Sequence, residues 1–310
     1  MSLNKKIAVV PKHYIGSFIL VTSLFALWGF ANDITNPLVA AFKSVFDNLS
    51  NAQSSTIQFA FYGGYATMAI PAALFIQKYS YKAGILLGLA LYALGALLFI
   101  PAANTMEFIW FPLSLYILTF GLAFLETTAN PYILSMGDKE TATQRLNLAQ
   151  AFNPIGSLLG MFVASKLILA NLSTTQFRNE QFSNNPEFEN MSASDVNVKI
   201  DAALQSAKSL DPLGFAAKQV SDIEIIRNPY AILGVVVLIM FFVFLLKKMP
   251  NTEQNNQKIK GMDSARRLFK NKCWKEGVIA QTFYVAAQIT CWTFIIQYAI
   301  ENVPGMTMSK

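Results

Sequence analysis

Two carboxylic acids lie within apolar stretches of this chain. Asp33 stands in FALWGFANDITNPLV and Glu126 in FGLAFLETTANPYIL, and an Asn-Pro pair follows each acid after about one helical turn. A charge in the hydrocarbon core of a membrane is costly unless it faces a polar cavity or a partner group, so such acids usually mark ion or substrate pathways. We therefore expect Asp33 and Glu126 to couple a proton to the movement of a solute.

Amide and aromatic side chains accompany the two acids. Amides offer paired hydrogen-bond donors and acceptors, which suit a ring of hydroxyl groups, and aromatic faces pack on the apolar side of a pyranose. These residue types indicate a sugar as the solute. The candidate sugar-binding residues are Trp28, Asn32, Asn36, Asn147, Gln150, Asn153, Gln288 and Trp292, with Tyr65 and Tyr284 as further aromatic candidates.

The composition indicates a membrane protein. The chain has 310 residues, of which 54% are hydrophobic and 14% charged, whereas a soluble domain carries about 25% charged residues. Apolar runs of about 20 residues are long enough to cross a membrane as helices. We predict an all-α membrane protein with seven spans, at 15–46, 54–77, 83–103, 107–136, 145–171, 229–246 and 276–303.

The distribution of basic residues predicts the orientation. With the N-terminus in the cytoplasm, sixteen of the 24 Lys and Arg residues fall on the cytoplasmic side, in agreement with the positive-inside rule. The net charge of +6 is then a topology signal, and we expect no nucleic-acid partner. Residues 1–13 are polar and lack a cleavage pattern, so we expect no signal peptide.

Prolines mark the points where the helical backbone is expected to open. Proline has no N–H and clashes with the carbonyl four residues earlier, so Pro37, Pro131 and Pro154 would free the carbonyls of Asp33, Thr127 and Gln150. Exposed backbone is tolerated at membrane depth only within protein or along a water-filled cavity. Asp33 and Glu126 also occupy corresponding places in two three-span units, which is typical of a transporter site.

The polar segments divide the chain. We expect a six-helix transmembrane domain over 1–248, a cytoplasmic inter-domain linker over 249–275 and the first helix of an incomplete C-terminal domain over 276–310. Residues 172–228 are expected to form a periplasmic insert with a helix over 196–209. An amphipathic piece of the linker, at 264–269, is expected to lie along the membrane face.

Five sequence blocks carry a family resemblance. SYKAGILLGLALYALGALLF, FLETTANPY, RLNLAQAFNPIGSLLG, AQTFYVAAQITCW and YAIENVPGM, in this order along the chain, resemble the fucose–galactose–glucose:proton symporters of the major facilitator superfamily. The resemblance runs from Phe25 to the C-terminus with a gap over the insert. It implies two six-helix domains around a central sugar site, and proton-driven sugar uptake by alternating access across the bacterial inner membrane.

The resemblance also implies roles for single residues. Glu126 matches the acid of the fourth span near sugar and proton, Gln150 matches a sugar-contacting amide, and Trp28 and Trp292 match aromatic positions near the cavity. The likeness is strongest to the L-fucose transporters of the family, in which the acid of the first span aligns with Asn36. The acid is at Asp33 in this chain, so acid and amide have exchanged places on one helix face.

Several alternatives stay open at this point. The sugar could be galactose or glucose, and a chain that ends after seven spans is either a fragment, which we favour, or an inactive truncated sugar-binding membrane protein. An exporter of amphipathic compounds would have fewer amides in its cavity, and a receptor would bind sugar without accumulating it. No nucleophile–base pair or metal cluster is visible, so we expect no enzyme, metal or cofactor. The expected partners are a monosaccharide, a proton and the lipid bilayer, with a monomeric full-length protein.

Overall fold

The computed structural model describes residues 8–46, 49–250 and 261–303, and this part of the chain contains helices and no strands. Seven helical segments in it are long and apolar enough to cross a membrane, as predicted. The helices of these segments are α1 (Ile15–Thr35), α2 (Leu38–Val45), α3 (Asn51–Lys78), α4 (Tyr81–Leu97), α5 (Phe99–Thr105), α6 (Trp110–Ser135), α7 (Ala142–Gln150), α8 (Asn153–Phe162), α11 (Pro212–Leu246) and α13 (Lys272–Asn302).

Two of the three prolines divide a span into separate helices. α1 ends just before Pro37, which is the N-cap of α2, and Pro154 lies in the first turn of α8 after the end of α7. The prediction of an opening at Pro131 is wrong, because α6 continues through it as one helix. A single proline removes one hydrogen bond, and the closely packed neighbours of α6 hold the helix together across that gap.

The first six spans pack through small residues. The main contacts join α4 to α6, α3 to α6, α1 to α8 and α11 to α4. At Gly156 in α8, an added Cβ would lie 1.8 Å from the carbonyl oxygen of Ala26 in α1, and at Gly121 in α6 it would lie 2.3 Å from the backbone nitrogen of Tyr92 in α4. Glycine is required at both points because the helix backbones touch.

A buried arginine fixes one end of the bundle. Arg145 in α7 is fully buried, and its guanidinium reaches backbone carbonyls on both sides of the turn that leaves α6. It donates hydrogen bonds to the carbonyl oxygens of Val9, Ile133, Leu134 and Asp138 and to the Thr141 hydroxyl, at 2.7–3.2 Å. A buried charge with this many partners holds a fixed geometry, so Arg145 joins the N-terminal segment to α6 and α7.

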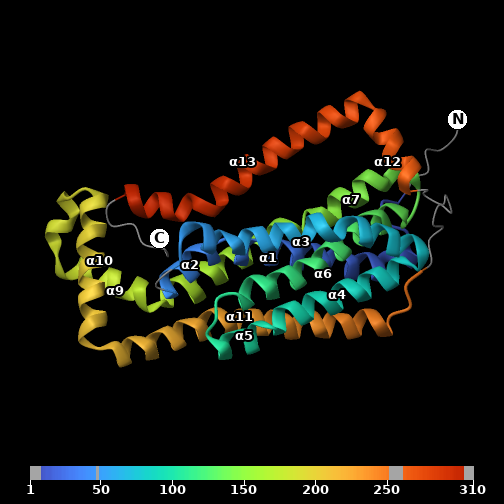
Figure 1. Cartoon of the computed structure of the whole chain (residues 1–310). Helices are drawn as coiled ribbons and strands as arrows, with labels where there is room; N and C mark the ends of the chain where they lie inside the picture. Colours follow the sequence, from blue (N-terminus) through green and yellow to red (C-terminus); the bar gives the residue numbers. More distant parts are fainter. Residues whose placement is uncertain (1–7, 47–48, 251–260, 304–310) are drawn as a thin grey trace, which may run out of the picture.

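The segment between the fifth and sixth spans forms helices at the opposite end of the bundle (Figure 1). It contains α9 (Ser173–Asn184) and α10 (Ala193–Leu210), and α10 covers the helix predicted over 196–209. The helix that contains the predicted sixth span at 229–246 begins earlier, because α11 starts at Pro212. The Asp211 carboxylate caps α11 by accepting a hydrogen bond from the Gly214 N–H at 2.9 Å, and a helix started there needs no apolar run.

α13 lies apart from the six-span bundle for much of its length. Figure 1 shows it crossing one side of the bundle, with its C-terminal end beside α2 and α10. α12 (Gly261–Lys270) precedes it and confirms a helix at the predicted amphipathic piece. The remainder of the predicted linker at 251–260, residues 1–7 and residues 304–310 lie outside the described residues.

Candidate functional site

Asp33 belongs to a chain of polar side chains at the break between α1 and α2. The Asn36 side-chain amide donates a hydrogen bond to Asp33 Oδ1 at 3.3 Å. Gln58 in α3 is buried, and its Nε2 lies 3.3 Å from the Asn36 carbonyl oxygen and 3.4 Å from Asn36 Oδ1. The predicted acid and amide therefore touch, and a second helix holds the amide in place.

Aromatic side chains surround this group. The Trp28 indole nitrogen and the Tyr65 hydroxyl are neighbours, although neither reaches a hydrogen bond of ordinary geometry. The Tyr62 hydroxyl lies within electrostatic reach of Asp33, and the Tyr65 hydroxyl within that of Glu126. Asp33 on α1 and Glu126 on α6 thus lie near two different tyrosines of α3, which are about one helical turn apart.

Four buried polar atoms of this region have no hydrogen-bond partner: Trp28 Nε1, Gln58 Oε1, Tyr62 OH and Tyr65 OH. Leaving a buried donor or acceptor without a partner costs about 1–3 kcal/mol per group. Most buried polar groups are satisfied, and those that are not usually mark a water, an ion or a ligand. These four atoms of the α1–α3 face are therefore available to water or to a polar ligand.

Glu126 is linked to α7 through a neighbour on its own helix. The Asn130 side chain, one turn further along α6, donates a hydrogen bond to the Glu126 carbonyl oxygen at 3.1 Å. Its Oδ1 accepts a hydrogen bond from Gln150 Nε2 at 3.3 Å. Glu126 is partly buried and Gln150 is exposed, so the polar surface extends from α3 across α6 to α7.

The comparisons with known proteins identify the family. The sequence model of the Major Facilitator Superfamily matches residues 14–178. The chain belongs to the Major Facilitator Superfamily. The predictions of an all-α membrane protein with the major facilitator fold, and of the resemblance itself, are confirmed.

Sugar transporters are prominent among the similar proteins. The L-fucose-proton symporter of Haemophilus influenzae is 53% identical over 292 residues, which are 94% of this chain and 63% of that protein. The corresponding symporter of Escherichia coli is 37% identical over 96% of this chain and 62% of its own length. A glucose/galactose transporter of Brucella abortus is 27% identical over 96% of this chain.

Solved structures agree with the sequence comparison. The crystal structure of the Escherichia coli fucose:proton symporter matches with a TM-score of 0.67 at 36% identity, over 95% of this chain and 65% of that one. A second crystal structure, of a superfamily transporter in the outward conformation, matches with a TM-score of 0.68 at 36% identity, over 96% of this chain and 66% of that one. The chain spans about 63% of the length of the curated L-fucose-proton symporter it matches.

The other amides predicted for the site have different surroundings within this superfamily fold. The Asn153 side chain donates a hydrogen bond to the Phe25 carbonyl oxygen at 3.3 Å, and its own backbone oxygen lies 2.1 Å from the position of a Cβ on Gly29. Asn153 therefore sits in the close seam between α1 and α8. The Asn32 amide bonds to the Trp28 carbonyl oxygen at 3.2 Å on its own helix, and Asn147 is exposed on α7.

Gln288 and Trp292 are not joined to the groups around Asp33 and Glu126. Both lie on α13, whose main neighbours are α2, α10 and α12, and the Trp292 side chain is 42% exposed. Within the described residues, no hydrogen bond connects either side chain to α1, α3 or α6. Their predicted contact with the sugar stays a prediction.

Sequence reasoning missed Gln58, Tyr62 and Asn130 as members of the site. Gln58 is a polar residue in an otherwise apolar span, which is a signal of the same kind that selected Asp33. Asn130 belongs to the Asn-Pro pair that served only to mark a helix break. Tyr62 carries no distinguishing sequence signal, because tyrosine is common in membrane spans for packing and interface reasons.

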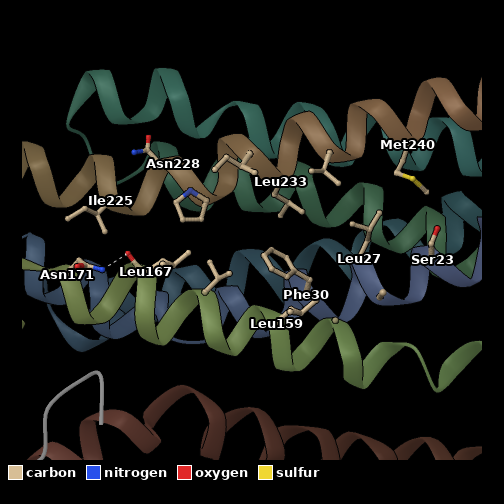
Figure 2. A pocket seen from close by; sticks show the side chains of 16 residues that line it. Ser23, Leu27, Phe30, Leu159, Leu167, Asn171, Ile225, Asn228, Leu233 and Met240 are labelled. Atoms are coloured by element: carbon tan, nitrogen blue, oxygen red, sulfur yellow. Dashed lines mark hydrogen bonds between the residues drawn. The ribbon is translucent and has the colours of Figure 1, made fainter.

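A separate apolar groove runs between α1, α8 and α11 (Figure 2). Its volume is about 840 Å³, and the only polar residues among those lining it are Ser23, Asn171 and Asn228. Asn171 and Asn228 lie at one end of the groove and Ser23 at the other. This groove has too few polar groups along its length to recognise a sugar, so the polar α1–α3–α6 surface is the better candidate site.

Proposed function

We propose that this chain forms the sugar- and proton-binding part of a proton-coupled sugar symporter of the bacterial inner membrane, with L-fucose as the sugar. The observation that carries the proposal is the polar cluster of Asp33, Asn36 and Gln58, with unpartnered donors and acceptors beside it. The 53% identity to a protein described as an L-fucose-proton symporter supports the choice of sugar.

The two acids divide the proton work in this proposal. Glu126 binds and releases the proton that accompanies the sugar, because it is a partly buried acid on α6, one turn before the Asn130 side chain that contacts Gln150. Asp33 relays the proton along α1. Protonation removes a charge that is costly within a membrane, so sugar binding and protonation both favour the change of conformation and each promotes the other.

The sugar hydroxyls find complementary groups on the α1–α3 face. Gln58 Oε1 accepts a hydrogen bond, the Trp28 indole N–H donates one, and the hydroxyls of Tyr62 and Tyr65 do either. The indole ring of Trp28 also offers an apolar face to the C–H groups of a pyranose. Galactose and glucose present similar hydroxyls, and the 27% identity to a glucose/galactose transporter makes them the second candidates.

The orientation in the membrane follows the charge distribution. We place the N-terminus and the segment 249–275 in the cytoplasm, because these segments and two neighbouring loops hold most of the Lys and Arg residues. α9 and α10 are then periplasmic. The same proposal divides the chain into a six-helix domain, a linker and the start of a second domain. It also includes a monomeric full-length protein.

Sugar binding to the purified protein tests the proposal. Isothermal titration calorimetry should show that the protein binds L-fucose more tightly than D-galactose or D-glucose. Gln58→Leu should weaken L-fucose binding about tenfold, because one buried polar contact is worth roughly 1 kcal/mol or more. Thr56→Val is the matched control, because Thr56 lies on the same helix and its hydroxyl donates a hydrogen bond to the Gln53 carbonyl oxygen. Equal binding by Gln58→Leu and the unchanged protein would contradict the assigned site.

A further inference from the structure

Unpartnered buried polar atoms gather at a second place in the molecule. Nine such side-chain atoms occur among the described residues, and four of them belong to the α1–α3 face. Another four are Thr174 Oγ1, Thr175 Oγ1, Arg178 Nε and Gln297 Nε2. All four residues line one cavity of about 380 Å³. The same physical signal that marks the central site therefore recurs at this outer cavity.

The outer cavity lies between α2, α9, α10 and α13, at the end of the bundle where these helices meet (Figure 1). α9 contributes Arg178 and the threonines, and α13 contributes Gln297. The α13 wall is held in place because the Asn197 amide in α10 donates a hydrogen bond to the Ile300 carbonyl oxygen at 3.0 Å. Small-molecule pockets typically start at about 300 Å³, so the volume admits a monosaccharide.

Four of the five charged side chains that line the outer cavity have interactions within the protein. Arg178 Nη1 lies 3.8 Å from the Asp201 carboxylate, and its Nη2 donates a hydrogen bond to Asn197. Lys208 lies over the Phe215 ring, and Lys43 has an interaction of its own. Glu301 is the fifth, and its side chain is exposed. The buried atoms without partners are the Arg178 and Gln297 N–H donors and two threonine hydroxyls. An uncharged ligand rich in hydroxyl groups satisfies them better than an ion does.

Part of the lining of the outer cavity is apolar. Phe177 and Ile200 line it, and both belong to the small apolar cluster that holds α9 and α10 together. A pyranose has hydroxyl groups at its rim and C–H groups on its face, so it suits a cavity lined by both polar and apolar groups.

We infer that the outer cavity is a second monosaccharide-binding site, in which the sugar bridges Arg178 on α9 and Gln297 on α13. The inference rests on the proposed function for the identity of the sugar. The Arg178 Nε–H and the Gln297 amide donate to sugar hydroxyls, and the hydroxyls of Thr174 and Thr175 donate or accept. Bound sugar ties α13 to the segment between the fifth and sixth spans.

The test uses substitutions that remove only unpartnered polar atoms. Thr175→Val keeps the shape of a buried side chain, and Gln297→Leu keeps most of its volume, so the double variant should fold and unfold at the temperature of the unchanged protein. Thr290→Val is the control on α13, because the Thr290 hydroxyl bonds to the Ala286 carbonyl oxygen of its own helix at 2.8 Å. Gln58→Leu, which weakens L-fucose binding at the central site, provides the background.

Hydrogen–deuterium exchange with and without L-fucose gives a local readout in the purified protein. In the Gln58→Leu background, L-fucose should still slow exchange in α9 and in the last turns of α13, and should do so equally with Thr290→Val added. Adding Thr175→Val and Gln297→Leu should raise the L-fucose concentration needed for half of this protection about tenfold or more.

The outcomes separate the two sites. The outer site would be overturned if L-fucose did not protect α9 and α13, or if the protection survived Thr175→Val with Gln297→Leu. The outer cavity would then hold only water. If Gln58→Leu does not weaken the L-fucose protection of α1 and α3, that result contradicts the central site and leaves the outer site untouched. The proposed function can therefore fail without the outer site failing, and the reverse also holds.

Discussion

The two faces of α1 differ in how closely they pack and in whether their polar atoms have hydrogen-bond partners. Toward α8, Gly29 and Gly156 bring the backbones into contact, and the Asn153 amide is satisfied by the Phe25 carbonyl oxygen. Toward α3, Trp28 on α1 and three polar side chains on α3 have buried atoms that lack partners. An Asn next to a proline can thus serve a closed seam or an open site. Whether the surrounding polar atoms have hydrogen-bond partners, rather than the residue type, distinguishes the closed seam from the open site.

Disrupting the seam between α1 and α8 with a larger side chain should have the largest effect. Gly156→Leu places a Cβ 1.8 Å from the Ala26 carbonyl oxygen, so α8 cannot pack on α1 and we expect no folded protein, as judged by size-exclusion chromatography in detergent. Gly63→Ala in α3 is the control, because its Cβ would meet only Tyr116 Cε2, at 3.7 Å. Normal yield and stability of Gly156→Leu would show that the seam is not close-packed.

Neutralising the acids should separate exchange from accumulation. Glu126→Gln keeps a side chain that hydrogen-bonds but cannot cycle a proton, so the protein produced from its intact gene should bind and exchange L-fucose and fail to accumulate it. Asp33→Asn should also abolish accumulation if Asp33 is a relay. Radiolabelled L-fucose uptake and counterflow in cells measure both. Accumulation by Asp33→Asn equal to that of the parent would make Asp33 a structural residue.

Two asparagines on opposite sides of α1 should show smaller and contrasting effects. Asn36→Ala should weaken L-fucose binding severalfold because Asn36 positions Asp33 and Gln58. Asn153→Ala should leave binding unchanged and lower the stability by about 1 kcal/mol through the lost bond to Phe25. Calorimetry and thermal unfolding distinguish them. Loss of L-fucose binding by Asn153→Ala at unchanged stability would place Asn153 in the site after all.

The sequence predicted features that depend on local patterns. Seven apolar runs, the breaks at Pro37 and Pro154, and the helix at α10 follow from hydrophobicity and backbone chemistry alone. The early start of α11 was missed because Gln219 and Asp222 are polar. Gln219 donates to the Val45 carbonyl oxygen at 2.8 Å, and Asp222 accepts hydrogen bonds from Ser173, so distant segments stabilise this end of the helix.

The candidate site was predictable only in part for the same reason. Asp33 and Asn36 are three residues apart on one helix, so their contact follows from helix geometry. The bond from Gln58 to Asn36 joins residues 22 positions apart on different helices, and no local pattern specifies it. The role of Arg145 likewise depends on carbonyls of the N-terminal segment and α6, whereas its sequence context indicates only a basic loop residue.

Proton movement driven by sugar tests the central claim most directly. Cells that produce the protein from its intact gene, de-energised in weakly buffered medium, should take up protons when L-fucose is added, and a pH electrode should record alkalinisation of the medium. The account predicts alkalinisation with L-fucose that disappears in Glu126→Gln while L-fucose exchange continues. L-fucose entry without any change of pH in the unchanged protein would contradict proton coupling through this site.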